Sequence, residues 1–354
     1  MENIENYIIQ HSVNISNAIK KMDKGGIGFI AIANNDDIIG IVTDGDFRRS
    51  ILDGISLKEN VKRIMNKDFI YLNQQYKQAD VKKIFSESCA NHLPVLQERK
   101  LIDIITFENY NINKNNKKRK KLYNPVVIMA GGMGTRLYPF TRILPKPLIP
   151  LGNDPIIKVI MDSFAIFGME KFLVSLNHKG KMIKAYFYDH EFDYNIKFFE
   201  EVKPLGTAGS LKLMHKSINE TFFVSNCDII IKSDYDKILE FHQIRQNAIT
   251  LVGSVRHHTV PYGVCEIENG GDLTKIIEKP EYDYLTNTGL YVMEPEVINL
   301  IPENHRFDMT DLIAKAQESE LRVGVFPVSD KSWIDIGQIK DYNLAISDYE
   351  KYPG

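Results

Sequence analysis

A short hydrophobic strand that runs directly into a glycine-rich turn is the feature that most constrains the fold of this chain. The segment begins at Pro125 and reads PVVIMAGGMGTRLYPFTRILPKPLIP. Its aliphatic run predicts a buried strand, and the glycines after it let backbone N–H groups approach a polyphosphate closely. Arg136 and Lys146 follow the turn and can neutralise phosphate charge. The segment therefore indicates a nucleotide site at the end of a strand in an α/β domain.

The glycine spacing of this turn differs from both standard phosphate-binding loops. Gly132 and Gly134 are followed by Leu137, where a dinucleotide-binding fingerprint requires glycine. A P-loop requires Gly-Lys followed by Ser or Thr, and the segment lacks that sequence. We therefore expect a phosphate site of another kind, in which the glycines share the contacts with Arg136 and Lys146.

The first 110 residues contain one structural unit twice: a helical stretch, two apolar strands joined by a turn, and a polar tetrapeptide that opens a helix. The copies include GIGFIAIANNDDIIGIVTDGDFRRSI and HLPVLQERKLIDIITFENY, in which Thr43 and Thr106 are 63 residues apart. Both place a hairpin turn between β-branched runs. This repeat resembles a tandem pair of CBS domains.

In that family, the resemblance implies that Thr43 and Asp46 hold the phosphate and the ribose of a purine nucleotide. A hydroxyl at a helix N-terminus donates to phosphate, and a carboxylate accepts from ribose hydroxyls. The alternative is that Asp46 only stabilises the N-terminus of its helix. The second copy has Asn109 in place of the carboxylate, so we expect one nucleotide per pair, bound mainly by the first copy.

Residues 111–123 contain six Lys or Arg and no acidic residue. This stretch has no apolar periodicity, which is typical of a solvated linker. Aromatic residues are nearly absent and both flanking regions are acidic, which disfavours a nucleic-acid-binding or membrane-binding arm. We therefore predict a tandem pair at 1–112, divided at about residue 60, a cationic linker at 113–123 and a second domain at 124–354.

The composition predicts a cytoplasmic protein. Every window of eighteen residues contains a charged residue, so no transmembrane helix is expected. The first ten residues, MENIENYIIQ, contain acidic residues and no basic residue, which is unlike a signal peptide. The three cysteines lack the spacing of a disulfide framework or a structural zinc site. We expect no nucleic-acid partner, no membrane partner, and a homo-oligomer.

Taken as a whole, GGMGTRLYPFT followed by PKPLIP resembles the signature of sugar-1-phosphate nucleotidyltransferases. The resemblance covers about 230 residues and keeps the order of that family's motifs. It implies a Rossmann-like α/β domain, with a mixed, mainly parallel sheet between helices, preceded by the tandem CBS pair. The further motifs are VSLNHKGKMI, EEVKPLGTAGSL, VSNCDII, YGVCEI, EKP, NTGLYVM and WIDIGQIKDY.

The implied reaction is attack of a sugar-1-phosphate oxygen on the α-phosphorus of a nucleoside triphosphate, which releases pyrophosphate. Alignment and charge neutralisation drive such transfers, and the resemblance assigns the catalytic roles to Arg136 and Lys146. The implied nucleotide-binding residues are Ala130, Gly131, Gly132, Gly134, Thr135, Glu201, Gly206 and Thr207. The implied sugar-phosphate-binding residues are Asn177, Gly263, Glu278, Lys279, Asn287 and Thr288.

Asp228 and Asp335 match the two metal-binding aspartates of that family. Each follows a strand-like apolar run, from which two carboxylates can converge on one ion. Mg²⁺ prefers oxygen ligands and phosphates. The expected cofactor is therefore Mg²⁺. One departure from the family is Cys227, which stands where a glycine is common.

Glu201 bears on the choice of base. It lies where thymidylyl and uridylyl enzymes of the family carry glutamine, whose amide suits a ring N–H between two carbonyls. Guanine presents N1–H beside an exocyclic amine, and an ionised carboxylate accepts from both. GTP is therefore favoured, CTP is the second choice, and the alternative is that Glu201 is a solvated acid.

For the sugar, the CBS fusion resembles the guanylyltransferases of bacterial legionaminic acid synthesis, which implies glucosamine 1-phosphate; mannose 1-phosphate is the alternative. A rival of another class is a non-enzymatic nucleotide sensor with a decayed transferase fold. Arg136, Lys146, Asp228 and Asp335 are all present, which disfavours that rival.

Overall fold

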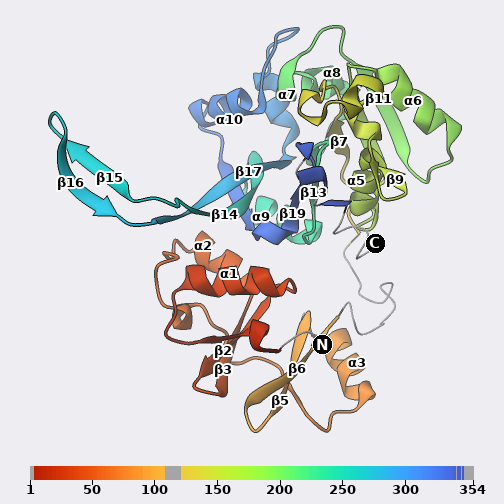
Figure 1. Cartoon of the computed structure of the whole chain (residues 1–354). Helices are drawn as coiled ribbons and strands as arrows, with labels where there is room; N and C mark the ends of the chain where they lie inside the picture. The colour runs from red at the N-terminus through yellow and green to blue at the C-terminus, as the bar shows by residue number, and fades with distance from the viewer. Residues whose placement is uncertain (1–3, 89, 108–120, 340, 344, 347–354) are drawn as a thin grey trace. The chain divides into compact units, whose positions relative to one another are not determined.

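The computed structural model describes residues 4–346, except for 89, 108–120, 340 and 344 (Figure 1). Most of the expected linker, and Asn109, lie outside the described residues. The chain divides into two compact units. The first contains Met1–Lys118, Val255–Leu285 and Ser329–Lys331, and the second contains Arg119–Ser254, Thr286–Val328 and Ser332–Gly354. The segment 255–285, predicted within the second domain, thus groups with the repeat.

Each copy of the repeat forms a three-stranded sheet. In each sheet, the first two strands are parallel and the last two form an antiparallel hairpin. The first copy contains β1 (Ile8–Gln10), α1 (Ile15–Gly25), β2 (Phe29–Asn34), β3 (Asp37–Thr43) and α2 (Asp44–Leu52). The second contains β4 (Leu72–Asn73), α3 (Gln78–Glu87), β5 (His92–Gln97) and β6 (Lys100–Thr106).

Helix α1 shows how the local sequence fixes an element of the first copy. Its N-cap is Asn14, whose side chain accepts a hydrogen bond from the backbone N–H of Asn17. The helix ends at Gly25 and is capped by Gly26, whose φ of 81° is in the left-handed region that favours glycine. Between these caps it buries Ile15, Ser16, Ala18, Ile19 and Met22, which share one helical face.

A seven-stranded sheet forms the centre of the second unit, in the order β11-β10-β7-β12-β17-β14-β18. The pairs among β11, β10, β7 and β12 are parallel, β17 is antiparallel to β12, and β14 is parallel to β18. The expected mixed, mainly parallel sheet is therefore confirmed. The strands are β7 (Val126–Met129), β10 (Lys171–Leu176), β11 (Asn195–Glu200), β12 (Phe222–Asn226), β14 (Ile249–Thr259), β17 (Glu281–Met293) and β18 (Val323–Val328).

The sequence of β7 explains its central place, because all four residues are buried. Val126 and Ile128 pack into one hydrophobic cluster, and Val127 and Met129 pack into another. Alternate side chains of a strand point to opposite faces of the sheet, so both faces are covered. The first cluster includes residues of α5 (Ile156–Ala165), α6 (Gly180–Asp189) and α9 (Tyr235–Arg245), and the second includes residues of α8 (Leu211–Met214) and α10 (Met309–Glu318).

The parallel strands end together at one edge of this sheet. Met129, the last residue of β7, pairs with Ser175 of β10 and with Asn226 of β12. The segments that follow these strands carry the glycine-rich turn, Asn177 and Asp228. Ligands of open α/β sheets bind beyond the carboxyl ends of the strands, so this edge is where a substrate site is expected.

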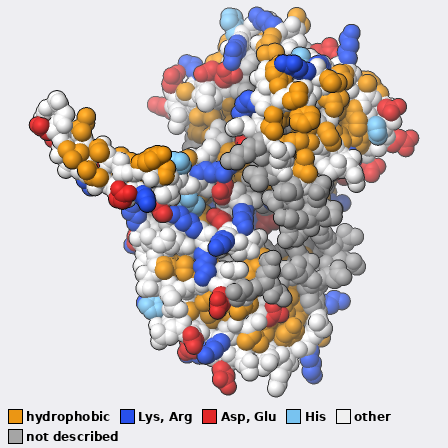
Figure 2. Space-filling model, viewed as in Figure 1, with side chains coloured by type: hydrophobic (Ala, Val, Ile, Leu, Met, Phe, Trp, Pro, Cys, Tyr) orange, Lys and Arg blue, Asp and Glu red, His pale blue; other side chains and the backbone are white. Residues whose placement is uncertain are grey.

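A long hairpin connects β14 to β17, and we call residues 260–280 the hairpin arm. Its strands, β15 (Val264–Glu268) and β16 (Asp272–Ile277), are antiparallel. The turn at its tip contains Gly270 and Gly271, both with positive φ. Apolar side chains are exposed along the arm, as Figure 2 shows; Ile267 is 65%, Leu273 56% and Ile276 58% exposed.

The remaining elements are short. None of the helices in the described part of the chain is long and apolar enough to cross a bilayer. The short elements are η1 (Ile4–Tyr7), η2 (Val61–Arg63), η4 (Thr135–Leu137), α4 (Phe140–Ile143), η5 (Lys146–Leu148), β8 (Pro150–Leu151), β9 (Asp154–Pro155), α7 (Gly206–Gly209), η6 (His215–Ser217), β13 (Ile229–Ile231), η7 (Pro295–Leu300), η8 (Asp330–Ser332) and β19 (Trp333–Asp335).

Candidate active site

The glycine-rich turn begins at the end of β7 and packs against the segment that carries Lys146. The N–H of Ala130 donates to the carbonyl of Ser175 at 3.0 Å, which continues the pairing of β7 with β10. Gly134 has a φ of 66°, and a Cβ there would lie 2.9 Å from Cγ2 of Thr141 and 3.0 Å from Cβ of Lys146. Glycine is thus required at Gly134 both by the backbone and by the approach of Lys146.

Lys146 is nearly buried, with 6% of its surface exposed, and it forms an ion pair with Asp228. A buried ammonium group needs such a partner, because burial of an unpaired charge is costly. The adjacent Cys227 is buried, and burial together with the charge of Asp228 raises its pKa to about 12. The thiol therefore remains neutral and adds no charge beside the pair.

Asp228 and Asp335 are brought together by a two-stranded ladder. Strand β19 ends at Asp335 and pairs antiparallel with β13, which follows Asp228 directly. The N–H of Gly337 donates to Oδ1 of Asp335 at 2.7 Å. A Cβ on Gly337 would lie 2.7 Å from Oδ1 of Asp335 and 3.5 Å from Oδ2 of Asp228. The two carboxylates therefore face the same small space.

The electrostatics of this pair suit a cation. Burial raises the pKa of Asp335 above its usual value, and the neighbouring charge of Asp228 raises it further, while the N–H of Gly337 and the ammonium of Lys146 lower it. The described residues contain no group of three or more His, Cys, Asp or Glu placed to hold a metal. Mg²⁺ commonly uses only one or two carboxylates, with phosphates and water completing its ligands. Asp228 and Asp335 match this number and kind of protein ligands.

Glu201 lies beside the glycine-rich turn, held by contacts from β10 and from its own loop. The Ser175 hydroxyl donates to Oε1 of Glu201 at 2.6 Å, and the Leu205 N–H donates to Oε2 at 3.0 Å. The Asn177 amide donates to the Glu201 carbonyl at 3.0 Å, and a Cβ on Gly131 would lie 2.8 Å from Oε1. Gly131, Asn177 and Glu201 thus form one cluster. The supporting roles of Ser175 and Leu205 were not predicted from the sequence.

Gly206 and Thr207 are held by Asp308, a residue that sequence reasoning missed. Gly206 has a φ of 83°, and a Cβ there would lie 2.6 Å from Oδ1 of Asp308. The N–H of Thr207 donates to the same oxygen at 3.0 Å. Asp308 also forms a capping box with Asp311 at the start of α10. The three-residue spacing of these two aspartates at the start of a helix is the sequence signal that could have identified Asp308.

Asn287 and Thr288 lie on β17, and their side chains make contacts within the sheet. The Thr288 hydroxyl donates to the carbonyl of Val252 at 2.8 Å, and Thr288 is 2% exposed. The Asn287 amide donates to the Tyr291 hydroxyl at 2.8 Å. Their assignment to the sugar remains a prediction, and these contacts also give both residues a structural role.

Three of the predicted sugar-phosphate residues belong to the first compact unit, at the hairpin arm. A Cβ on Gly263 would lie 3.1 Å from Oε2 of Glu278. Lys279 is exposed and has a φ of 45°, which is uncommon for a residue with a side chain. In the second unit, Gly132, Thr135 and Arg136 belong to the turn already described, and Thr135 and Arg136 are exposed.

The predicted CBS ligand residues contact each other. Oδ2 of Asp46 accepts from the N–H of Thr43 at 2.9 Å and from its hydroxyl at 2.7 Å. Oδ1 of Asp46 forms an ion pair with Arg49 at 2.5 Å. The bonds between Thr43 and Asp46 form a capping box at the start of α2. A capping box agrees with the alternative in which Asp46 stabilises the N-terminus of its helix. Nucleotide binding by these residues stays a prediction.

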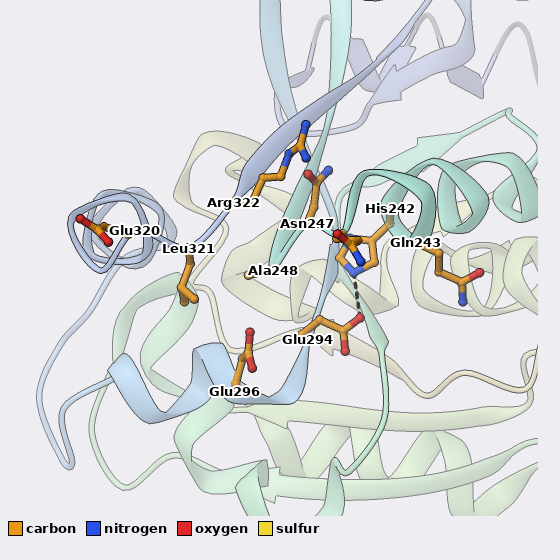
Figure 3. A pocket seen from close by; sticks show the side chains of 10 residues that line it. His242, Gln243, Asn247, Ala248, Glu294, Glu296, Glu320, Leu321 and Arg322 are labelled. Atoms are coloured by element: carbon orange, nitrogen blue, oxygen red, sulfur yellow. Dashed lines mark hydrogen bonds and ion pairs between the residues drawn. The ribbon is translucent and has the colours of Figure 1, made fainter.

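A cavity of about 560 Å³ lies elsewhere in the second unit (Figure 3). Figure 3 shows His242 and Glu294 pointing toward one another, with 3.1 Å between Nε2 and Oε1. The His242 hydrogen bond is the main cause that lowers the pKa of Glu294. Glu294 follows Met293, which pairs with Phe222 at the start of β12. The cavity is therefore at the edge where the parallel strands begin, away from Asp228, and we assign it no catalytic role.

Comparison with protein families gives two matches. The family model described as nucleotidyl transferase matches residues 125–352. The CBS domain model matches twice, at residues 5–53 and 61–109. The expectation of a transferase-type domain preceded by a tandem CBS pair is therefore confirmed.

Curated relatives match the same part of the chain. A mannose-1-phosphate guanyltransferase of Kluyveromyces lactis is 34% identical over 237 residues, which cover 61% of this chain and 62% of that protein. A UTP–glucose-1-phosphate uridylyltransferase of Synechocystis is 31% identical over 244 residues, with 62% of each chain covered. The crystal structure of HddC from Yersinia pseudotuberculosis has 26% identity and a TM-score of 0.51, covering 64% of this chain and 99% of that one. The chain thus spans about three fifths of the length of these two curated relatives.

Proposed function

The chain belongs to the nucleotidyl transferase family, and from this we propose that it transfers GMP from GTP to a sugar 1-phosphate and releases pyrophosphate. The observation that carries the proposal is the cluster of Lys146, Asp228 and Asp335 beside the glycine-rich turn. It offers one cation and two carboxylates at the edge where the parallel strands end. That combination suits a reaction between two phosphate groups.

In the proposed reaction, an oxygen of the sugar phosphate attacks the α-phosphorus of the nucleotide, and the bond from that phosphorus to the bridging oxygen of pyrophosphate breaks. Alignment of the groups and neutralisation of their charge lower the barrier. Arg136 binds the triphosphate, and Lys146 moves its hydrogen bonds between Asp228 and the reacting phosphate. Lys279 binds the incoming sugar phosphate.

Mg²⁺ is the proposed cofactor, with Asp228 and Asp335 as its protein ligands. When bound, it would screen the negative charge of the phosphates and help to align them. The ammonium of Lys146 is paired with Asp228 in the structure, so that carboxylate already stabilises a positive charge. The residues themselves orient the phosphates, and with one cation and two carboxylates they carry a net negative charge that a bound cation would offset.

For the base we propose guanine, read by Glu201, with cytosine as the alternative. Each carboxylate oxygen of Glu201 accepts one hydrogen bond from the protein and has a further lone pair for a donor of the base. For the sugar we propose glucosamine 1-phosphate, on the resemblance to the CBS-fused guanylyltransferases of legionaminic acid synthesis. Mannose 1-phosphate, named for the Kluyveromyces lactis relative, is the alternative.

A pyrophosphate-release assay tests this function on the whole chain. We expect the fastest release with GTP and glucosamine 1-phosphate, in a panel of four nucleoside triphosphates and several hexose and hexosamine 1-phosphates with Mg²⁺. Faster release with CTP or UTP would contradict the assignment of the base. The absence of release with every pair would contradict the transferase and favour the nucleotide sensor.

We also propose that the CBS pair binds one purine ribonucleotide through Thr43 and Asp46. The Asp46→Asn variant keeps an oxygen that can accept from the Thr43 N–H in the capping box of α2 but loses the charge, whereas Asp46→Ala loses both. In calorimetry with AMP, ADP, ATP and GMP, we expect binding to weaken with Asn and disappear with Ala. Asp53→Ala, at the other end of α2, is the control. Unchanged binding in Asp46→Ala would leave the helix cap as the only role.

A further inference from the structure

The base of the hairpin arm contacts helix α1 inside the first compact unit. Val255 of β14 is 2% exposed and belongs to one hydrophobic cluster with Ile15 and Ile19 of α1. Lys20 of α1 forms an ion pair with Glu281, the first residue of β17. The first CBS copy therefore contacts both strands that lead into and out of the arm.

A second polar contact lies two residues further along β17. Nδ1 of His257 and Oδ1 of Asp283 are 2.5 Å apart. Burial would raise the pKa of Asp283, but the hydrogen bonds from His257 and Ser16 and the charge of Lys20 hold it below its usual value. Asp283 is therefore an anion at neutral pH. It joins helix α1, through Ser16, to β14 and β17.

The spacing of these residues fixes the position of strand β17 along helix α1. Ser16 and Lys20 are four residues apart and share one face of α1. Asp283 and Glu281 are two residues apart and share one face of β17. Each helix residue meets one strand residue, so a shift of β17 along α1 would break both contacts at once.

Glu281 is separated from Lys279 only by Pro280. Pro280 is buried, and its carbonyl accepts from the N–H of Val260 at 3.0 Å, which ties the two sides of the arm together. The ring of Pro280 fixes its own φ, and Lys279 has a φ of 45°. The backbone between Glu281 and Lys279 thus has little freedom, and the position of one determines the position of the other.

From this geometry we propose that Lys20 of the first CBS copy is a positioning residue for the sugar-phosphate site. By holding Glu281, it fixes Lys279 in the orientation that receives the phosphate of the sugar 1-phosphate. This inference rests on the proposed function and gives the CBS pair a part in it. The side chains of Lys20 and Glu281 are 28% and 53% exposed, so their pair contributes little to overall stability and its loss should not unfold the protein.

The protonation of this region sets one condition for the test. Burial raises the pKa of Asp23, also on α1, to about 7; Asp44 and Asp330 raise it further, and His257 and Lys331 lower it. Near pH 7, Asp23 would be ionised in only part of the molecules, so kinetic constants measured there would average over two charge states of the α1 surface. All variants are compared at one pH above 8, where Asp23 is ionised in each.

The kinetic test reverses the charge of Lys20 in the whole chain. For Lys20→Glu we expect the KM for sugar 1-phosphate to rise on the order of tenfold, because Lys279 is misplaced, while kcat and the KM for GTP change less than about twofold. The double variant Lys20→Glu with Glu281→Lys should recover most of the loss. Lys24→Glu is the control, since Lys24 is exposed on the same helix and forms no ion pair within the described part of the chain.

Hydrogen exchange provides a readout that needs no activity. We expect faster exchange at residues 278–285 in Lys20→Glu than in the wild type, and wild-type exchange in the charge-swapped double variant. An unchanged sugar-phosphate KM would overturn the proposal, and so would equal increases in both KM values or unchanged exchange. If the wild type releases no pyrophosphate with any substrate pair, the proposed function fails instead, and the exchange data still test the contact.

Discussion

Turnover is expected to fall at least about a hundredfold when Asp228 or Asp335 is replaced by asparagine, the loss typical of removing an electrostatic stabiliser. Both carboxylates face one small space, and each amide keeps the shape of the side chain without its charge. Initial rates at saturating Mg²⁺ and saturating substrates measure the effect. Near-normal turnover in either variant would contradict the assignment of both residues to one Mg²⁺.

The two variants differ in what they do to Lys146. Asp228→Asn leaves a 6% exposed ammonium without its partner, which costs about 3–5 kcal/mol when a buried pair is broken. Asp335→Asn leaves that pair intact. We therefore expect a lower melting temperature only for Asp228→Asn, so Asp335→Asn tests catalysis without a stability effect. Asp193→Asn, an exposed carboxylate of the same unit, should change neither quantity.

The second large effect is expected at Glu201. Glu201→Gln removes an acceptor for the donor pair of guanine and leaves an amide that can meet uracil. The preference for GTP over UTP should therefore shrink by about 1–3 kcal/mol, or about 5- to 150-fold in the ratio of kcat/KM values. An unchanged ratio would mean that Glu201 does not read the base.

The contacts of Glu201 make this variant interpretable. A glutamine oxygen can still accept from the Leu205 N–H, and its amide can donate to the Ser175 hydroxyl, so the loop should keep its shape. Glu200→Gln is the matched control, because Glu200 is the neighbouring exposed acid and pairs with Lys184. That control should leave the GTP to UTP ratio unchanged.

The sequence predicted the sheet, and the grouping of the candidate residues at one of its edges, because the signals there are local. The run from Val126 to Met129 is apolar throughout, and two of the glycines after it have a structural reason: Gly131 approaches Glu201 closely, and Gly134 has a positive φ. The order of motifs then placed Asp228 and Asp335 in one site. Their pairing through β13 and β19 joins residues 107 positions apart, which no local pattern shows.

Other contacts could not be predicted, because their residues carry no local signal. Lys20 and Glu281 are 261 residues apart, and each alone is an ordinary surface charge. The segment from Thr43 to Asp46 does carry a local signal, but the signal is ambiguous, because the same spacing suits a nucleotide-binding site and a helix cap. Thr288 is similar, because a buried threonine can bind a sugar or, as its bond to Val252 shows, stabilise a strand.

The tip of the hairpin arm offers a place to alter the protein without disturbing its core. Gly270 and Gly271 have φ values of 89° and 117°, and a Cβ at either would meet no atom within 4 Å. Exposed turns of this kind accept insertions readily. A fluorophore or a short peptide tag inserted between the two glycines would move with the arm, so the arm could be followed in solution while Lys20 and Lys279 keep their natural surroundings.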